Sequence, residues 1–336
     1  MAHLSKRLEM ALGPQKFSLW IWSVLLLALV GGACCTKWRG TDPPGAVKIT
    51  YAMPISVAAI PAYVALEKGF WKEEGLDVQA QMFPSGRQAL DALLSKSAEV
   101  MSVSETPLMH AILQGNKIYI VTTVTQHQEV KLIARRDKGI QSGKELVGKR
   151  VATLPGTNSD YFMYEFLRAN GIPIENVKVA NMDPPNMVTA FVQGNIDAYF
   201  AWEPHIYYAQ KQLAQQSIVF PPGDLYHGRH CVAMNQEFAS AHPDVVEKLI
   251  RGFQRAEKFV NENPAESMAI VSKATSMDIG ALKSLWPEYK VIVGIDPQLI
   301  PILDKEAQWA RTISKSTGPV PNFNDYIYPQ KMAAAK

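Results

Sequence analysis

Residues 186–205 read NMVTAFVQGNIDAYFAWEPH, and their pattern indicates the fold class of the chain. An amphipathic segment that begins at Met187 leads through a Gly-Asn turn into an apolar strand over residues 196–201. The chain leaves this strand through Trp202 and Glu203, and Pro204 suits the start of the next helix because proline is favoured at the first helical position. Helix, strand, polar strand exit and helix in this order are typical of an α/β layer.

The same design occurs earlier, over residues 92–107. There a helical segment leads through a polar turn and an acidic residue into the apolar strand 100–103, which again ends in polar residues before a helix. Two copies of this helix-strand-helix unit predict two similar α/β lobes. In each lobe the end of the strand would face a space between the lobes. The aligned pairs are Glu99 with Asp197, Ser104 with Trp202 and Glu105 with Glu203.

Composition indicates an ordered globular protein. The chain has 336 residues, of which 47% are hydrophobic and 19% charged, and this length favours two domains or one large one. The formal net charge is +3, and most of it lies in the first 33 residues, where three cations accompany one acidic residue. We therefore expect no nucleic-acid partner.

The N-terminus reads as a signal segment over residues 1–33. A basic start precedes the apolar run 17–30, and small residues stand before Cys34. This arrangement resembles a bacterial lipoprotein processing site, which would leave Cys34 lipidated, with residues 34–46 as a tether. The alternatives are ordinary signal cleavage and an uncleaved anchor, the latter because residues 17–36 carry no charge and are about long enough to span a bilayer. All three place the folded part in the periplasm or outside the cell.

From residue 47 onward, strand-like and helical segments alternate, which predicts an α/β fold with mainly parallel sheets covered by helices on both faces. After Pro243 the pattern is helical. Those last helices need a sheet to cover, so we expect the chain to cross between lobes twice and to form a hinge. The predicted first lobe comprises residues 47–130 and 232–330, and the second comprises residues 131–231.

Three motifs resemble those of a known family. They are EKGFWKEEGLDV at residues 67–78, LVGKRVA at residues 146–152 and GNIDA at residues 194–198, the last followed by Trp202-Glu203-Pro204. In this order they resemble the periplasmic solute-binding proteins of ABC importers for nitrate, sulfonates and taurine, a family that also includes binders of thiamine-precursor pyrimidines. The resemblance implies a type II periplasmic binding protein fold, a small-molecule solute, permease subunits as partners, a monomer and no cofactor.

The candidate site follows from the fold class. Ligands of open α/β sheets sit beyond the carboxyl ends of the strands, so the strand-exit loops are the informative positions. These loops carry hydroxyls, amides and aromatic side chains suited to a small polar molecule. The predicted ligand-binding residues are Ser56, Ser85, Ser104, Glu105, Gln126, Thr157, Asn158, Ser159, Tyr161, Asn186, Trp202 and Glu203.

The charge of the ligand stays open at this point. Residues 156–159, before a helix, are able to hold an anion on free backbone N–H groups. Alternatively Asn158 or Ser159 is an ordinary helix cap. Glu105 and Glu203 at the two aligned strand tips favour a neutral or cationic nitrogenous ligand over a sulfonate or nitrate.

Other chemistry has less support. His227, His230 and Cys231 have a spacing that is compatible with a metal, but no carboxylate partner is apparent, and we expect no metal. A pyrimidine-synthase-like enzyme on the same fold is the first alternative function, although this sequence has no cysteine-rich stretch of the kind that goes with that activity. A membrane-anchored sensory ectodomain is the second.

Overall fold

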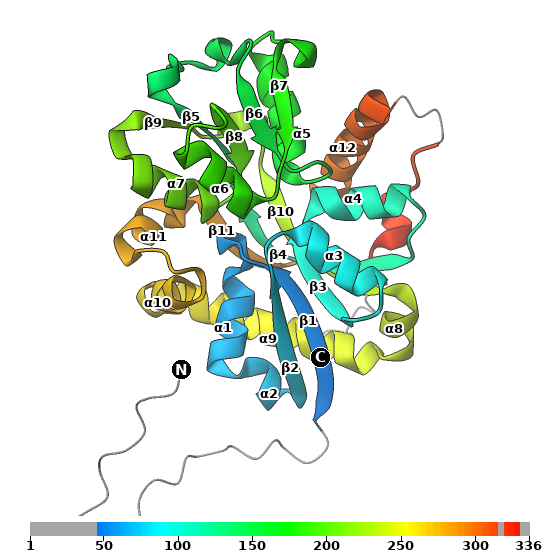
Figure 1. Cartoon of the computed structure of the whole chain (residues 1–336). Coiled ribbons are helices and arrows are strands. Elements are labelled where there is room, and N and C mark those ends of the chain that lie inside the picture. Colours follow the sequence, from blue (N-terminus) through cyan, green and yellow to red (C-terminus); the bar gives the residue numbers. More distant parts are fainter. Residues whose placement is uncertain (1–45, 315–318, 330–336) are drawn as a thin grey trace, which may run out of the picture. The chain divides into compact units, whose positions relative to one another are not determined.

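The computed structural model describes residues 46–314 and 319–329, which lie within one compact unit spanning residues 43–336 (Figure 1). The signal segment 1–33, the lipidation site Cys34 and the tether up to residue 45 lie outside the described residues. No helix in the described part is long and apolar enough to cross a membrane.

Among the described residues, six strands form the first sheet, in the order β11-β4-β10-β3-β1-β2. Strand β1 runs parallel to both β2 and β3, whereas β10 runs antiparallel to both β3 and β4. The edge strand β11 is antiparallel to β4. The strands span Val47–Pro54 (β1), Leu76–Phe83 (β2), Val100–Ser104 (β3), Ile118–His127 (β4), Gly228–Asn235 (β10) and Tyr289–Gly294 (β11).

The second sheet repeats this arrangement within the described part of the chain. Its order is β7-β6-β8-β5-β9, which corresponds to β2-β1-β3-β10-β4 of the first sheet. Strand β6 is parallel to β7 and β8, and β5 is antiparallel to β8 and β9. The bounds are Lys131–Arg135 (β5), Arg150–Thr153 (β6), Lys178–Asn181 (β7), Ala198–Ala201 (β8) and Ser217–Phe220 (β9).

Each sheet contains one strand that the chain enters directly after a strand of the other sheet. The chain leaves the first sheet at His127 and enters the second at Lys131, then returns between Phe220 and Gly228. Strands β5 and β10 therefore each follow a strand of the other sheet with no α-helix between, and both run antiparallel to their neighbours. The two-lobed α/β fold is confirmed, but the sheets are mixed rather than mainly parallel, because of these inserted strands and β11, which we did not predict.

The predicted repeat is visible in individual hydrogen bonds. Glu99, just before β3, accepts a hydrogen bond from the backbone N–H of Thr50 in β1 at 2.7 Å. Asp197, just before β8, accepts one from the backbone N–H of Arg150 in β6 at 2.8 Å. Each acidic residue joins the central parallel strand of its sheet to the next strand. The predicted lobe boundary at residue 231 falls inside β10, and the exact lobe boundaries remain a proposal.

Helices cover both faces of the first sheet, and others flank the second (Figure 1). One apolar cluster joins the first sheet to α1, α9, α10 and α11, and a second joins its opposite face to α3, α4 and α12 and continues into the second lobe. Helices α5, α6 and α7 flank the second sheet. The helices span Ile60–Lys68 (α1), Phe70–Glu73 (α2), Gly86–Leu94 (α3), Glu105–Leu113 (α4), Asn158–Ala169 (α5), Pro184–Val192 (α6), His205–Leu213 (α7), Gln236–Ala241 (α8), Pro243–Glu262 (α9), Pro264–Thr275 (α10), Ile279–Leu285 (α11) and Leu299–Ser314 (α12).

The contact between α2 and α9 has little spare room. The indole of Trp71 is buried, packs edge-on against Tyr51 and Phe253, and donates a hydrogen bond to the carbonyl of Leu249 at 3.0 Å. A Cβ atom at Gly252 would lie 2.1 Å from Cδ1 of this ring. Glycine is therefore required here because the rigid indole occupies the space that a side chain would need.

We expect Gly252→Ala to lower the free energy of unfolding. Overpacking against the buried ring costs about 1–3 kcal/mol, and the better helix propensity of alanine offsets up to about 1 kcal/mol of it. Urea unfolding followed by circular dichroism measures the difference. Lys258→Ala on the exposed face of α9 is the control and should change stability by less than about 0.5 kcal/mol. Equal stability of Gly252→Ala and the native protein would contradict the packing argument.

Candidate functional site

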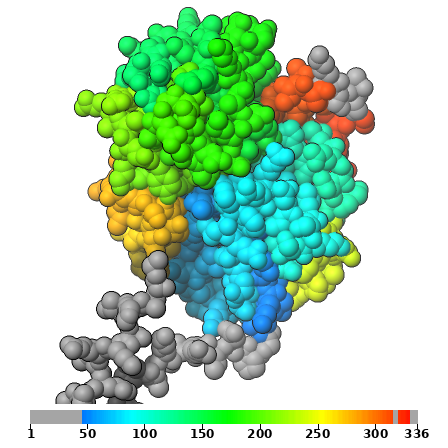
Figure 2. Space-filling model, viewed as in Figure 1, coloured from blue at the N-terminus to red at the C-terminus, as the bar shows by residue number. Residues whose placement is uncertain are grey.

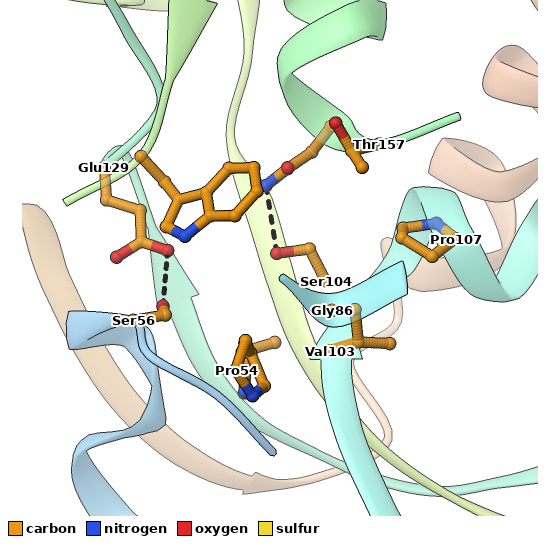
Figure 3. A pocket seen from close by; sticks show the side chains of 11 residues that line it. Pro54, Ser56, Gly86, Val103, Ser104, Pro107, Glu129 and Thr157 are labelled. Carbon is orange, nitrogen blue, oxygen red and sulfur yellow. Dashed lines mark hydrogen bonds between the residues drawn. The ribbon is translucent and has the colours of Figure 1, made fainter. Parts of the chain in front are cut away.

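A small cavity lies where strand exits of the two sheets meet. Its volume is about 20 Å³, enough for about one water molecule. Figure 2 shows the green second lobe resting on the blue and cyan part of the first along a continuous seam. Both lobes and the crossover between β4 and β5 line the cavity. The lining residues are Pro54, Ser56, Gly86, Val103, Ser104, Pro107, Glu129, Thr157, Asn158, Trp202 and His230 (Figure 3).

Three helices begin at this cavity. Gly86 is the first residue of α3, Ser104 directly precedes α4 and Thr157 directly precedes α5. Free N–H groups give a helix N-terminus a partial positive charge, so each helix favours negative charge at its start. A Cβ atom at Gly86 would lie 2.0 Å from Cγ2 of Val103. Glycine therefore allows α3 to start this close to β3.

Hydrogen bonds join the two lobes across the cavity. Asn158 in the second lobe donates from Nδ2 to Oγ of Ser104 in the first at 3.0 Å (Figure 3). The indole N–H of Trp202 donates to the carbonyl of Ile55 at 3.3 Å. These bonds connect neutral groups, each of modest net strength. The lobes are therefore held together over the cavity by contacts that are easily exchanged for bonds to a solute.

Glu129 is the acidic residue of the cavity wall. Its side chain is buried and accepts hydrogen bonds from Oγ of Ser56 at 2.7 Å, the backbone N–H of Ala58 at 3.0 Å and the hydroxyl of Tyr289 at 3.2 Å. Burial, opposed by these hydrogen bonds and assisted by the negative charge of Glu203, raises the pKa of Glu129 to about 8. Glu129 is therefore mostly protonated at pH 7.

His230 is a second polar group of the wall with unused capacity. Its Nε2 lies 3.1 Å from Oγ of Ser102, whereas its buried Nδ1 has no hydrogen-bond partner among the described residues. Burial lowers the pKa of His230 to about 3, so the imidazole is neutral at pH 7. Among the described residues that line the cavity there is neither lysine nor arginine. The wall as a whole carries little formal charge.

The structure brings five of the predicted ligand-binding residues to the cavity. They come from both lobes, and the role of each in binding stays a prediction. Ser85 lies beside them as the cap of α3, its Oγ accepting from the N–H of Gln88 at 3.4 Å. The five are Ser56, Ser104, Thr157, Asn158 and Trp202.

Glu105 and Glu203 do not face each other across the cavity, contrary to the expectation from the repeat. Glu105 is buried behind the wall, where it accepts hydrogen bonds from the hydroxyl of Tyr226 and the backbone N–H of Arg229. Glu203 is buried beside Lys131, 3.3 Å away, and also accepts from a backbone N–H of α7. Glu105 is the first residue of α4, and Glu203 lies two residues beyond the end of β8.

The remaining predicted residues also lie away from the cavity lining. Gln126 donates to a carboxylate oxygen of Asp296 at 2.6 Å, and Asn186 is exposed at the start of α6. Ser159 is buried within hydrogen-bond distance of Thr157 at 2.9 Å. Tyr161 packs edge-on against Trp309 of α12.

Two polar residues of the wall, Glu129 and His230, were not predicted from the sequence as ligand-binding residues. Glu129 lies two residues beyond the end of β4 at His127, in the crossover to the second sheet. A lone carboxyl in a crossover has no motif that would identify it. For His230 the sequence suggested only a metal site, and the described residues contain no cluster of three or more His, Cys, Asp or Glu side chains that could hold a metal ion.

Stability should respond to pH through His230. In the unfolded chain a histidine has a pKa near 6.5, so acidification protonates the unfolded state first and destabilises the fold. Between pH 7 and pH 5 the native protein should lose about 2 kcal/mol more than His230→Asn does. Urea unfolding of both proteins at the two pH values measures this difference. Parallel losses in the two proteins would contradict the buried, neutral state of His230.

Curated relatives are binding proteins. A protein of Brucella abortus that is named as a binding protein without a stated ligand is 29% identical over 245 residues, covering 69% of this chain and 75% of that protein. The taurine-binding periplasmic protein of Escherichia coli is 26% identical over 231 residues, covering 65% of this chain and 68% of that protein. Both alignments span most of the described part of the chain.

Solved structures show the same fold at low sequence identity. The alkanesulfonate-binding protein SsuA of Xanthomonas axonopodis, solved with MOPS bound, has a TM-score of 0.75 at 16% identity over 86% of this chain and 99% of that one. The desulfurization enzyme DSZB has a TM-score of 0.61 at 13% identity, over 84% and 97%. The fold is that of periplasmic binding proteins, and the enzyme DSZB shares it. The model of the NMT1/THI5 like family matches residues 57–267, more than half of the chain, and the chain therefore belongs to this family.

Proposed function

We infer that this protein is the solute-binding component of an ABC importer and that it captures a small polar solute between its two lobes. The observation that carries this inference is the cavity at the strand exits, whose wall combines side chains of both lobes with the crossover that links them. The binding-protein relatives support the same function. Its partners are then the solute and the permease subunits of the importer.

Capture requires the lobes to move apart. The cavity has room for about one water molecule, which is less than a nitrate, a sulfonate or a pyrimidine needs. The hydrogen bonds from Asn158 to Ser104 and from Trp202 to Ile55 therefore have to break on entry. Because the chain crosses between the sheets twice, the segments 128–130 and 221–227 are the natural hinge.

The ligand class that the wall favours is a small organic acid with an oxygen-rich anionic head, such as a sulfonate. The starts of α3, α4 and α5 converge on the cavity, and the unpartnered Nδ1 of His230 is available to a ligand hydroxyl or N–H group. From the sequence we expected a neutral or cationic ligand because of Glu105 and Glu203. Neither residue lines the cavity. Nitrate and pyrimidines remain as test compounds.

Catalysis is the alternative function, and one contact favours it. Oγ of Ser104 lies 3.3 Å from Nε2 of His127, an arrangement that resembles a nucleophile and its base. However, Nδ1 of His127 has no hydrogen-bond partner in the part of the chain that the structure describes, whereas a catalytic histidine is oriented by a third group. Cys231 is buried and does not line the cavity. We therefore propose binding without catalysis.

We further propose that the protein works in the periplasm as a monomer, held to the membrane through Cys34. The periplasmic relative supports the compartment. Labelling with a radioactive fatty acid, in the native protein and in Cys34→Ser, tests the anchor. Label that persists in Cys34→Ser would contradict it.

A thermal-shift screen tests the proposed function. A chain that begins at residue 43, where the compact unit starts, is heated with nitrate, alkanesulfonates, taurine, pyrimidines, amines and flavins. A ligand that binds only the folded state raises the melting temperature, with a stabilisation of about 2.7 kcal/mol at a concentration 100 times its Kd. We expect sulfonates to raise it. The absence of any shift across the panel would contradict solute binding.

Trp202→Ala should weaken solute binding by about 1–3 kcal/mol, because the indole lines the cavity and offers a large apolar face. Isothermal titration with the solute found in the screen measures the loss. Trp286→Ala removes a half-buried indole that does not line the cavity and serves as the matched control. Unchanged affinity in Trp202→Ala would remove this residue from the site.

A further inference from the structure

We propose that Glu129 is a specificity residue that receives the positively charged amino group of the solute. The protein would then select amino acids of the sulfonic or carboxylic type over the same acids without an amine. This inference rests on the proposed solute-binding function and names the part of the solute that Glu129 recognises.

The position of Glu129 suits this role. It lies with Ser56 on one side of the cavity, whereas Thr157, Ser104 and Gly86 lie on the other (Figure 3). The second group marks the starts of three helices, which favour an anionic head. A solute that enters as the lobes move apart, with its acid group at the helix starts, therefore presents its other end to Glu129.

The carboxyl group of Glu129 has acceptor capacity left for a ligand. A carboxylate offers about four acceptor positions. Two at Oε2 are taken by the N–H of Ala58 and the hydroxyl of Tyr289, and one at Oε1 is taken by Ser56. Oε1 thus retains one position, on a side chain that lines the cavity.

Within residues 46–314 and 319–329, Glu129 also has no counter-ion of its own. The nearest cation along the chain, Lys131, pairs with Glu203 at 3.3 Å and with Glu288 at 2.8 Å. The titratable groups that act on Glu129 from the elements around it are the carboxylate of Glu203 and the hydroxyls of Tyr63 and Tyr289, besides its hydrogen bonds from Ser56 and Ala58. A buried carboxylate without a cation is costly, so an ammonium group of the solute would supply the missing charge.

Binding of an amine should release a proton. The pKa of Glu129, near 8 in the empty protein, falls when a cation lies beside it, because the cation favours the charged form. At pH 7 the O–H bond of Glu129 breaks and its proton passes to the buffer. The ammonium keeps all its protons and donates one in a hydrogen bond to Oε1. Below pH 8 the affinity for such a solute should fall by up to about tenfold per pH unit.

Calorimetry on two pairs of acids tests the inference. Taurine is compared with ethanesulfonate, and β-alanine with propanoate, so that each pair differs in the amine. Titration of the native protein at pH 7 in two buffers of different ionisation enthalpy counts the protons released. We expect an amine-bearing member to bind at least about 30-fold more tightly than its partner and to release about one proton. The amine-free members should release none.

Two variants separate ligand recognition from structural support. Glu129→Gln should abolish the preference for the amine and the proton release, even if it also alters stability, because a purely structural carboxyl would move neither quantity. Glu288→Gln removes a partly exposed carboxyl that pairs with Lys131 outside the cavity, and both the preference and the proton count should persist in it.

The outcomes distinguish this inference from the proposed function. An amine-free acid that binds as tightly as its partner, binding of the amine without proton release, or an unchanged preference in Glu129→Gln would each overturn the role of Glu129. If none of the four acids binds but another solute of the thermal-shift panel does, the inference fails and the proposed function stands. If no solute binds at all, both fail.

Discussion

The exchange of strands between the two sheets is the constraint on which the rest of the structure depends. Strand β5 enters the second sheet directly from β4, and β10 enters the first directly from β9, so both connections between the lobes run through the middle of the fold. The helices that begin after β3 and β6 therefore start at the same place. A cavity shared by both lobes follows from this connectivity.

Charge around the cavity is arranged so that most of it is already compensated. Lys131 holds Glu203 and Glu288, and Glu105 lies against Tyr226 and Arg229 behind the wall. A buried charge is tolerated only when it is paired, so these groups are not available to a solute. What remains at the wall is the partial positive charge of three helix starts, the unpartnered Nδ1 of His230 and the uncompensated carboxyl of Glu129.

The positions of the strand exits were predicted correctly from the sequence. The directions of the side chains at those exits were predicted less well. Ser104 and Trp202 reach the cavity, whereas their neighbours Glu105 and Glu203 turn into buried networks on the other side. Adjacent residues at the start of a helix point in different directions, and which one faces the ligand depends on what packs behind it. Glu129 escaped prediction because its importance comes from neighbours 71 and 73 residues away, Ala58 and Ser56.

The α/β class, the two lobes and the family are predictable from the sequence. They follow from the order of apolar segments, the repeated unit and the three motifs. Those features are local or periodic, and the chain records them directly. Tertiary structure alone decided that the sheets are mixed, that β11 exists, and that Glu129 rather than Glu105 or Glu203 borders the cavity. The physical reason is that burial, strand insertion and charge pairing each depend on residues far apart in the sequence, which only the folded chain brings together.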